Sequence, residues 1–222
     1  MDCPGVDPAL LRAELETLEA ANQKLGAHGL LLQSIRQLLG ANPPADVRVL
    51  DLGTGLADIP RAIAAWARLQ KLSLTITAVD GNTQILDLAR AACGDWPEIK
   101  LEQHDLRTLP YPPESFDLVL CSLALHHFSD ADAVAVLRRI RELARRGCVV
   151  SDLRRNHLAI LTAKVLALMP LKSHAFRHDA LQSCRAAFSV SELRALARAA
   201  GWDNFQLRRQ QLYFRMTLEA IK

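Results

Sequence analysis

The sequence predicts an α/β fold in which a doubly wound, mostly parallel sheet of seven strands is covered by helices. The first observation is a series of near-continuous apolar runs separated by stretches with helical periodicity, which is typical of parallel strands buried on both faces. The second is an apolar run from Val47 that ends in an acid and a turn containing Gly53 and Gly55. Because half of the 222 residues are hydrophobic, the chain can form one sizeable core.

The periodicity of apolar residues predicts each element in order. Gly40 and the Pro43–Pro44 pair end the second N-terminal helix. Ser189 and Glu192 form a predicted capping box for a late helix, which Gly201 ends. We expect helices at 10–25, 30–39, 57–70, 82–93, 131–145 and 190–200. We expect strands at 47–51, 73–79, 99–103, 116–121, 147–151, 206–209 and 213–218, with the last two antiparallel.

The chain is expected to form one domain, 1–222, with four regions. Residues 1–45 hold the N-terminal helices, 46–152 the ligand-binding core, 153–188 a helical insertion, and 189–222 the closing helix and strand pair. The insertion interrupts the alternation of strands and helices, and it combines an apolar run with concentrated positive charge. We therefore expect the insertion to act as a lid over a substrate pocket.

Acids at the ends of successive strands indicate a nucleoside site. Asp80 lies 29 positions after Asp51, and Asp105 lies 25 positions after Asp80, a rhythm that suits a ribose-binding acid after a strand–helix–strand unit. The third glycine of the dinucleotide fingerprint is replaced by Asp58. Carboxylates would repel a diphosphate but would attract a sulfonium and an amino group. Asp51 and Asp105 could instead belong only to turns, a common place for aspartate.

From about Val47 to Asp152 the chain resembles the class I S-adenosylmethionine-dependent methyltransferases. Asp51-Leu52-Gly53-Thr54-Gly55 resembles the first motif of that family, and residues 116–122 resemble its fourth-strand motif. Residues 123–128 are similar to the quinone-biosynthesis methyltransferases and their small-molecule, polyketide-associated relatives. Ala57 stands where many members carry another glycine. The resemblance implies a Rossmann-like methyltransferase fold and S-adenosyl-L-methionine as cofactor.

The resemblance also implies roles for individual residues. Asp80 would hold the ribose hydroxyls, while Asp105 and Leu106 would flank the adenine. Asp51 and the glycine turn would place the methionine end of the cofactor. The expected cofactor-binding residues are Asp51, Gly53, Gly55, Asp58, Asp80, Gly81, Asp105, Leu106 and Ser122.

His126 and His127 are the candidate catalytic residues. They follow the carboxyl end of a predicted parallel strand, where ligands of open α/β sheets bind. An imidazole can remove a proton from a phenol or similar nucleophile near neutral pH. Because adjacent side chains point in different directions, at most one is expected to face the substrate, and the alternative is that both only hydrogen-bond to the loop. No metal is implied, since the pair lacks metal-ligand spacing with other His or Cys residues.

Arg155 and His178 are the candidate substrate contacts in the insertion. A similar Asp-Leu-Arg-Arg stretch and a later His-Asp pair recur in relatives near polyketide and quinone pathways. The predicted reaction is therefore methyl transfer to a small aromatic, quinone-like or polyketide-like acceptor, either anionic or lipophilic. Each of these charged residues could alternatively lie on a solvated helix face.

The charge distribution leaves other functions open. Residues 1–120 carry a net charge of −6 and residues 121–222 a net charge of +9, an asymmetry that can mark a face for an anionic partner. We expect the five arginines among residues 138–146 to form the solvated face of one helix instead. The alternatives are an RNA or protein methyltransferase that uses the basic half, a nicotinamide oxidoreductase, and a cofactor-binding protein without catalysis. Aromatic residues make up only 5%, too few for many base-stacking platforms, so no DNA partner is expected.

Cysteine usage and hydropathy indicate the compartment. The five cysteines are scattered without a C-x-x-C pair, which is typical of a reducing environment. The N-terminal residues lack the pattern of a secretory signal. The longest apolar run, 158–169, is shorter than the roughly 20 residues that a membrane span needs. We expect a cytoplasmic protein without a transmembrane segment, and the oligomeric state stays open.

Overall fold

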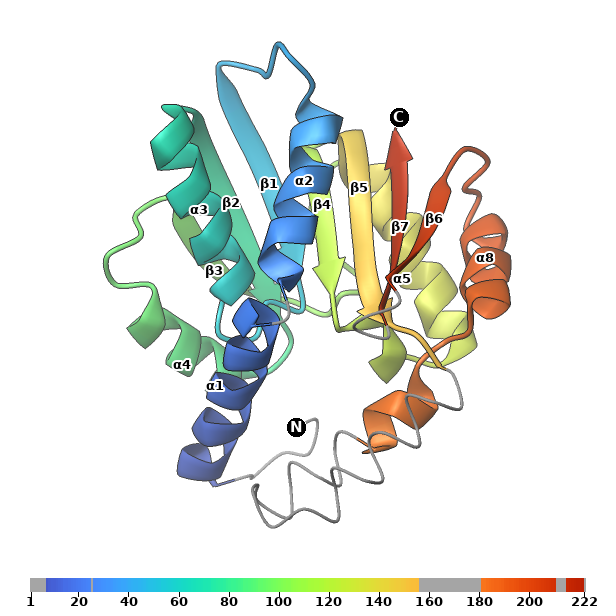
Figure 1. Cartoon of the computed structure of the whole chain (residues 1–222), viewed down its shortest axis with the longest axis horizontal. Coiled ribbons are helices and arrows are strands. Elements are labelled where there is room, and N and C mark those ends of the chain that lie inside the picture. Colours follow the sequence, from blue (N-terminus) through green and yellow to red (C-terminus); the bar gives the residue numbers. More distant parts are fainter. Residues whose placement is uncertain (1–6, 25, 156–180, 211–214, 222) are drawn as a thin grey trace.

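The computed structural model describes residues 7–24, 26–155, 181–210 and 215–221 (Figure 1). The helices, including the short 3-10 helix η1, are α1 (Pro8–Lys24), α2 (Ala27–Leu39), α3 (Asp58–Gln70), α4 (Thr83–Ala92), η1 (Leu125–His127), α5 (Asp130–Leu143) and α8 (Val190–Ala199). The strands are β1 (Asp46–Leu52), β2 (Ser73–Asp80), β3 (Ile99–Gln103), β4 (Phe116–Ser122), β5 (Ala144–Leu153), β6 (Gln206–Gln210) and β7 (Arg215–Ile221).

The seven strands form one sheet in the order β3-β2-β1-β4-β5-β7-β6. Strands β1 to β5 are parallel, whereas β7 is antiparallel to both of its neighbours, β5 and β6. The predicted doubly wound, mostly parallel sheet is therefore confirmed. Because the chain leaves β1 for β2 on one side and reaches β4 on the other, the strand order reverses between β1 and β4. Such a reversal opens a crevice at the carboxyl ends of the strands, where ligands of this fold class bind.

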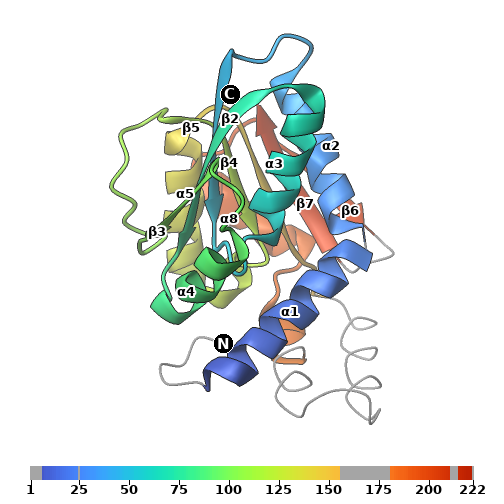
Figure 2. The same ribbon diagram turned by 90° about the vertical axis from the view of Figure 1, so that its left-hand side faces the viewer.

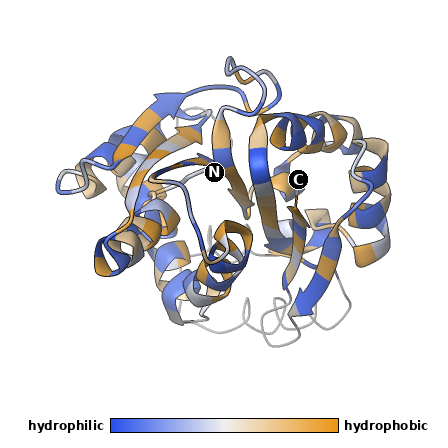
Figure 3. Cartoon of the chain, turned by 90° about the horizontal axis from the view of Figure 1, so that it is seen from above, coloured by the Kyte–Doolittle hydropathy of each residue, from blue (hydrophilic) through white to orange (hydrophobic). Residues whose placement is uncertain are grey.

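Helices cover both faces of the sheet (Figures 1 and 2). Helices α2 and α3 lie on one face, and α5 and α8 lie on the other. Successive residues of the central strands enter different cores: Val49 and Leu118 pack with the first pair of helices, and Leu50 and Val119 with the second. The strands are therefore buried on both faces, which explains their near-continuous apolar sequences. Each helix carries both hydrophobic and hydrophilic residues (Figure 3).

Several predicted helix ends are confirmed in their local chemistry. The Ser189 side chain accepts a hydrogen bond from the backbone of Glu192, and the Glu192 side chain accepts one from the backbone of Ser189, so the predicted capping box begins α8. Gly40 follows α2 with a positive φ of 68°, and its N–H donates a hydrogen bond to the carbonyl of Arg36. The sequence signals for these ends are local, which is why they could be recognised without the fold.

The boundary between α5 and β5 differs from the prediction. Helix α5 ends at Leu143, and β5 begins at Ala144 rather than at residue 147. Arg145 and Arg146 therefore lie on a strand, and the expectation that all five arginines share one helix face is wrong for these two. Their guanidinium groups lie 3.4 and 4.0 Å from the buried Asp117 carboxylate. A basic helix end and a basic strand start look alike in sequence, and the pairing with β4 decides between them.

The insertion lies mostly outside the described residues. Residues 156–180, which include most of the expected lid and His178, are not part of the description. At the base of the insertion, Arg154 bridges to Phe188, and the Arg155 N–H donates to the Phe188 carbonyl at 2.9 Å. The start of the last predicted strand at residue 213 also lies outside the described residues, and β7 continues to Ile221 instead of ending at 218. In the described part of the chain, no helix is long and apolar enough to cross a membrane.

Candidate active site

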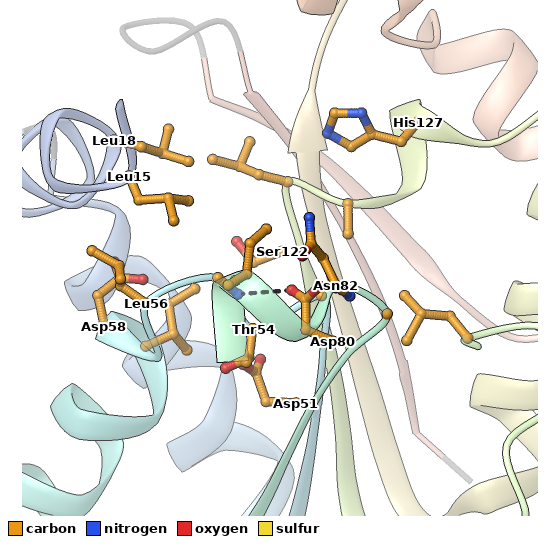
Figure 4. A pocket seen from close by; sticks show the side chains of 18 of the residues that line it. Leu15, Leu18, Asp51, Thr54, Leu56, Asp58, Asp80, Asn82, Ser122 and His127 are labelled. Atoms are coloured by element: carbon orange, nitrogen blue, oxygen red, sulfur yellow. Dashed lines mark hydrogen bonds between the residues drawn. The ribbon is translucent and has the colours of Figure 1, made fainter. Parts of the chain in front are cut away.

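A pocket of about 860 Å³ lies at the carboxyl ends of β1, β2 and β4, where the strand order reverses. This size is within the range of about 300–1,000 Å³ that is typical of small-molecule sites. Helix α1 closes one side of the pocket, and the segment after β4 closes the other (Figure 4). Among the expected site residues, the pocket is lined by Asp51, Gly53, Gly55, Asp58, Asp80, Gly81, Asp105, Leu106, Ser122 and His127.

The turn after β1 is held against β2. The N–H groups of Gly53 and Thr54 both donate to the Val79 carbonyl, at 2.8 and 3.0 Å. Gly53 has a φ of 70°, and a Cβ atom at this position would lie 2.5 Å from the Cβ of Ala124. Only glycine therefore fits at position 53. Ala57 is also left-handed, with φ of 57°, so the chain follows the path that a glycine would favour there and begins α3 directly after it.

Asp80 is fixed by backbone N–H groups on both sides. Its Oδ2 accepts from the Gly55 N–H at 3.2 Å (Figure 4), and its Oδ1 accepts from the Asn82 N–H at 3.0 Å. Asn82 in turn caps α4 by accepting from the Gln84 N–H. A carboxylate has about four acceptor positions, so a carboxylate oriented in this way can also receive ligand hydroxyls. The geometry is compatible with the predicted ribose contact.

Asp51 is a buried acid at the end of β1. Its exposed fraction is 2%, and burial raises the pKa of its carboxyl from 3.8 to about 7, with the charges of Asp58 and Asp80 adding to the rise. An uncompensated carboxylate in this place is costly, because the protein has removed its water. A cation placed beside Asp51 would favour the ionised form. The site thus contains an acid whose charge is most stable when a positive ligand is present.

Asp58 lines the pocket but is also held by the N-terminal helices. Its Oδ2 accepts from Asn22 Nδ2 at 3.0 Å and lies 2.8 Å from Nε2 of His28. Burial alone would raise the pKa of Asp58, but the hydrogen bonds from His28 and Asn22 outweigh burial and lower it. Asn22 also accepts from the buried Arg215 at 2.6 Å. Asp58 therefore joins α1, α2 and β7 around the pocket, a structural task that the sequence did not suggest.

The expected adenine-flanking residues, Asp105 and Leu106, follow β3 and line the pocket. Leu106 is buried and presents an apolar side chain to the pocket. The Asp105 carboxylate receives hydrogen bonds from the Arg107 guanidinium at 2.6–3.1 Å, and this contact lowers the pKa of Asp105. The Asp105 carboxylate oxygens therefore already accept hydrogen bonds from Arg107, while Leu106 is placed to pack against a flat ring.

The two adjacent histidines have different surroundings. His127 is exposed and lines the pocket, whereas His126 is buried, with an exposed fraction of 6%. The Nδ1 atom of His126 lies 2.7 Å from Oδ1 of Asp152, and the His126 backbone N–H donates to Oδ2 of Asp152 at 3.0 Å. His127 is thus the histidine that can reach a ligand. The arrangement agrees with the expectation that no more than one of the pair faces the substrate.

The structure gives Arg155 a partner at the base of the insertion. Its guanidinium forms an ion pair with the Glu192 carboxylate and donates to the Arg185 carbonyl at 3.5 Å. These contacts hold the two ends of the insertion together at the start of α8. A contact between Arg155 and substrate stays a prediction, as does the role of His178, which lies outside the described residues.

Sequence reasoning missed the apolar residues of the pocket. Leu15 and Leu18 of α1 lie across the cavity from His127 (Figure 4), and Leu123 and Phe128, which follow β4, also line it. The periodicity of α1 predicts that one of its faces is buried but not which partner covers it. Asp152 was also missed as a candidate, although it ends an apolar strand just as Asp51 does, and the same signal could have found it. Within the described residues, no group of three or more His, Cys, Asp or Glu side chains could hold a metal ion.

The pocket lining combines acidic and apolar residues. In the described part of the lining, acidic side chains outnumber basic ones, with Asp51, Asp58 and Asp80 gathered at the ends of β1 and β2 and the start of α3. Apolar side chains lie on both flanking walls, with Leu15 and Leu18 on α1 and Leu123 and Phe128 after β4. A ligand with a positive charge suits the acidic residues, and an uncharged ring system suits the apolar ones.

Comparison with known proteins agrees with this architecture. Residues 49–147 match the model of a methyltransferase domain family. A demethylmenaquinone methyltransferase of Deinococcus radiodurans is 39% identical over 84 residues, which are 37% of this chain and 33% of that protein. An uncharacterized methyltransferase of Bacillus subtilis is 29% identical over 103 residues, 46% of this chain and 36% of that protein. The chain thus spans about a third of the length of these curated relatives.

The fold extends beyond the matched domain. The crystal structure of a SAM-dependent methyltransferase from Aquifex aeolicus superposes with a TM-score of 0.64 over 97% of this chain and 98% of that chain, at 13% identity. Such a likeness shows that nearly the whole chain shares this fold. The matched domain contains the glycine turn, Asp80 and both histidines. The curated relatives each match less than half of this chain. Residues 49–147 are therefore similar to a methyltransferase domain, and nearly the whole chain has the fold of a SAM-dependent methyltransferase.

Proposed function

We propose that the chain transfers a methyl group from S-adenosylmethionine to a small, lipophilic, aromatic acceptor of the quinone or polyketide kind. The observation that carries this proposal is a pocket whose lining combines acids at the ends of β1 and β2 with apolar residues on α1 and beside His127. The partial match to a demethylmenaquinone methyltransferase supports an acceptor of this class.

The acidic residues fit the chemistry of the cofactor. Asp80, held by two backbone N–H groups, would bind the ribose hydroxyls, and Leu106 would pack against the adenine. Asp51 and the Gly53–Gly55 backbone would hold the methionine end, where both the amino group and the sulfonium are positive. A dinucleotide would instead bring a diphosphate next to Asp51 and Asp58, which is unfavourable. The donor set therefore favours S-adenosylmethionine over a nicotinamide cofactor.

The apolar residues fit the acceptor. Leu15, Leu18, Leu123 and Phe128 offer hydrophobic contacts to a ring system, and His127 lies on the same segment as Leu123 and Phe128. Mostly apolar walls with few polar groups are typical of small-molecule sites. An anionic acceptor could additionally use Arg107, which lines the same pocket.

His127 would act as the general base. When bound, the cofactor supplies a methyl carbon to which the acceptor atom bonds while the carbon–sulfur bond breaks and its electron pair stays on sulfur. His127 would take the proton that the acceptor atom loses, a contribution of roughly 10²–10⁴ in rate for a general base. The walls formed by α1 and the segment after β4 would exclude water and align the two reactants.

The position of the basic residues argues against the alternative that the chain methylates RNA or protein. Arg145 and Arg146, part of the basic half of the chain, lie at the start of β5, and β4 and β5 are parallel. The pocket lies at the other ends of these strands. A nucleic acid bound at this basic edge would not place its bases near His127.

Methyl transfer from radiolabelled S-adenosylmethionine tests the proposal directly. The acceptors should be a panel of quinols and phenols beside total RNA and bulk protein. We expect label in the quinol or phenol fraction, at a rate that falls by roughly 10²–10⁴ in His127→Ala. Label in RNA or protein alone would favour the macromolecular alternative. Calorimetry with S-adenosylhomocysteine and with NAD checks the cofactor, and binding of NAD alone would contradict the assignment.

A further inference from the structure

The segment between β4 and α5 is anchored to the end of β5. The Leu123 N–H donates to the Ser151 carbonyl at 2.9 Å, and Asp152 receives both the backbone N–H and the Nδ1 of His126. Leu123 has a φ of 54°, in the left-handed region that a bulky residue rarely adopts. Such a conformation is strained and persists only where surrounding contacts hold it. The bonds from β5 are contacts of this kind.

Asp152 determines the orientation of the His126 ring. A carboxylate can only accept hydrogen bonds, so the Nδ1 of His126 must carry the hydrogen. Oδ1 of Asp152 also accepts from the Leu153 N–H at 2.6 Å, which fixes the carboxylate itself. The side chains of His126 and Asp152 are only 4% and 1% exposed. The pair is therefore a rigid buried unit and not a group that meets substrate.

The His126 ring lies against the ring of His127. Their centroids are 4.2 Å apart, and the ring planes are inclined by 35°. One face of the exposed His127 ring is thus supported by a ring that Asp152 holds in place. An exposed histidine without such support would sample several rotamers. In most of these rotamers the ring nitrogen that should accept the proton would point away from the acceptor.

We propose that Asp152 is a positioning residue for methyl transfer, because its carboxylate fixes the buried His126 ring and this ring orients His127 toward the acceptor side of the pocket. The inference rests on the proposed role of His127 as the base. Displacement of a catalytic group by about 1 Å can cost roughly 10²-fold in rate. Asp152 thus affects catalysis without contact to substrate or cofactor.

Asp152→Asn tests the inference, and Asp117→Asn is its matched control. Asp117 is likewise buried, with 2% exposure, and accepts from a backbone N–H, that of Arg48 at 2.9 Å, but it lies at the start of β4, away from the pocket. We expect Asp152→Asn to lower kcat by about 10- to 100-fold with little change in the affinity for S-adenosylhomocysteine. Asp117→Asn should lower Tm while kcat stays close to that of the unchanged protein.

A double-mutant cycle separates positioning from general stability. If Asp152 acts through His127, Asp152→Asn should cost nothing further in kcat once His127 is Ala. An equal loss with and without His127 would overturn the inference and leave the role of His127 as base intact. No loss in His127→Ala itself would instead contradict the proposed base.

Ring order supplies a test that needs no turnover. Carbon-13 relaxation of the imidazole groups, with the His127 signals assigned from their loss in His127→Ala, should show a more mobile His127 ring in Asp152→Asn and no change in Asp117→Asn. His126→Phe should have the same effect as Asp152→Asn, because it keeps a ring but removes the Nδ1 bond, and it serves if Asp152→Asn fails to fold. An equally ordered His127 ring in the folded variants would refute the inference even if no acceptor is found.

Discussion

Replacement of Asp51 by Asn should change the pH dependence of stability. In the folded protein, burial raises the pKa of Asp51 from 3.8 to about 7, whereas in the unfolded chain the carboxyl returns to its ordinary value. Between these two pH values the folded state binds more protons than the unfolded state. The contribution of Asp51 to stability therefore falls as the pH rises from about 4 to about 7, and it stays low above that range.

The size of the effect follows from the pKa change. A rise from 3.8 to about 7 is equivalent to about 4 kcal/mol at 1.36 kcal/mol per pKa unit. Part of this cost is already present at pH 5, where the unfolded carboxyl is ionised. Between pH 5 and pH 8 the free energy of unfolding of Asp51→Asn should therefore rise by about 2–3 kcal/mol relative to the unchanged protein.

Urea unfolding at pH 5, 6, 7 and 8 measures this difference. Glu98→Gln is a suitable control. Arg68 lowers the pKa of this half-buried carboxyl, so the difference between the variant and the unchanged protein should vary little over the same range. A constant difference between Asp51→Asn and the unchanged protein from pH 5 to pH 8 would refute the reasoning. It would mean that water or another group compensates the Asp51 charge inside the fold.

Three further predictions concern the pocket. Asp80→Ala should weaken S-adenosylhomocysteine binding by about 1.5–3 kcal/mol for each hydroxyl bond lost, measured by calorimetry, and unchanged affinity would exclude the ribose contact. Gly53→Ala should lower the free energy of unfolding by at least about 1–2 kcal/mol, because φ is 70° and the new Cβ would meet Ala124, and a variant as stable as the parent in urea would contradict the turn geometry. Leu18→Glu should raise KM for a lipophilic acceptor but leave S-adenosylhomocysteine affinity nearly unchanged, whereas parallel losses would place Leu18 at the cofactor.

Local sequence signals identified several residues that line the pocket at the ends of β1 and β2. The glycines, Asp51 and Asp80 are recognisable because the turn needs left-handed backbone at Gly53, and because parallel strands bring their carboxyl ends to one edge of the sheet. Ser189 and Glu192 are recognisable for the same reason: both partners of the capping box lie within one helical turn. In each case the partners of the residue are close to it in sequence, or the order of the strands brings them together.

The residues that escaped prediction depend on contacts distant in sequence. Leu18 faces the pocket only because α1 packs across the strand ends, and the sequence of α1 does not reveal that partner. The distinction between His126 and His127 depends on Asp152, 26 positions after His126. The ion pair between Arg155 and Glu192 of α8 joins residues 37 positions apart, so no local signal reveals it.

The acidic residues of the pocket show why function and stability oppose one another in this fold. Asp51 lies without enough compensation near Asp58 and Asp80, so at neutral pH it weakens the folded state. Asn in its place would relieve that cost but would remove the negative charge that we propose attracts the sulfonium and the amino group of the cofactor. A positive ligand should lower the pKa of Asp51, so that affinity for the cofactor rises with pH up to about 7 in the unchanged protein and does so far less in Asp51→Asn. The same carboxyl that destabilises the protein alone therefore strengthens its complex with a cation.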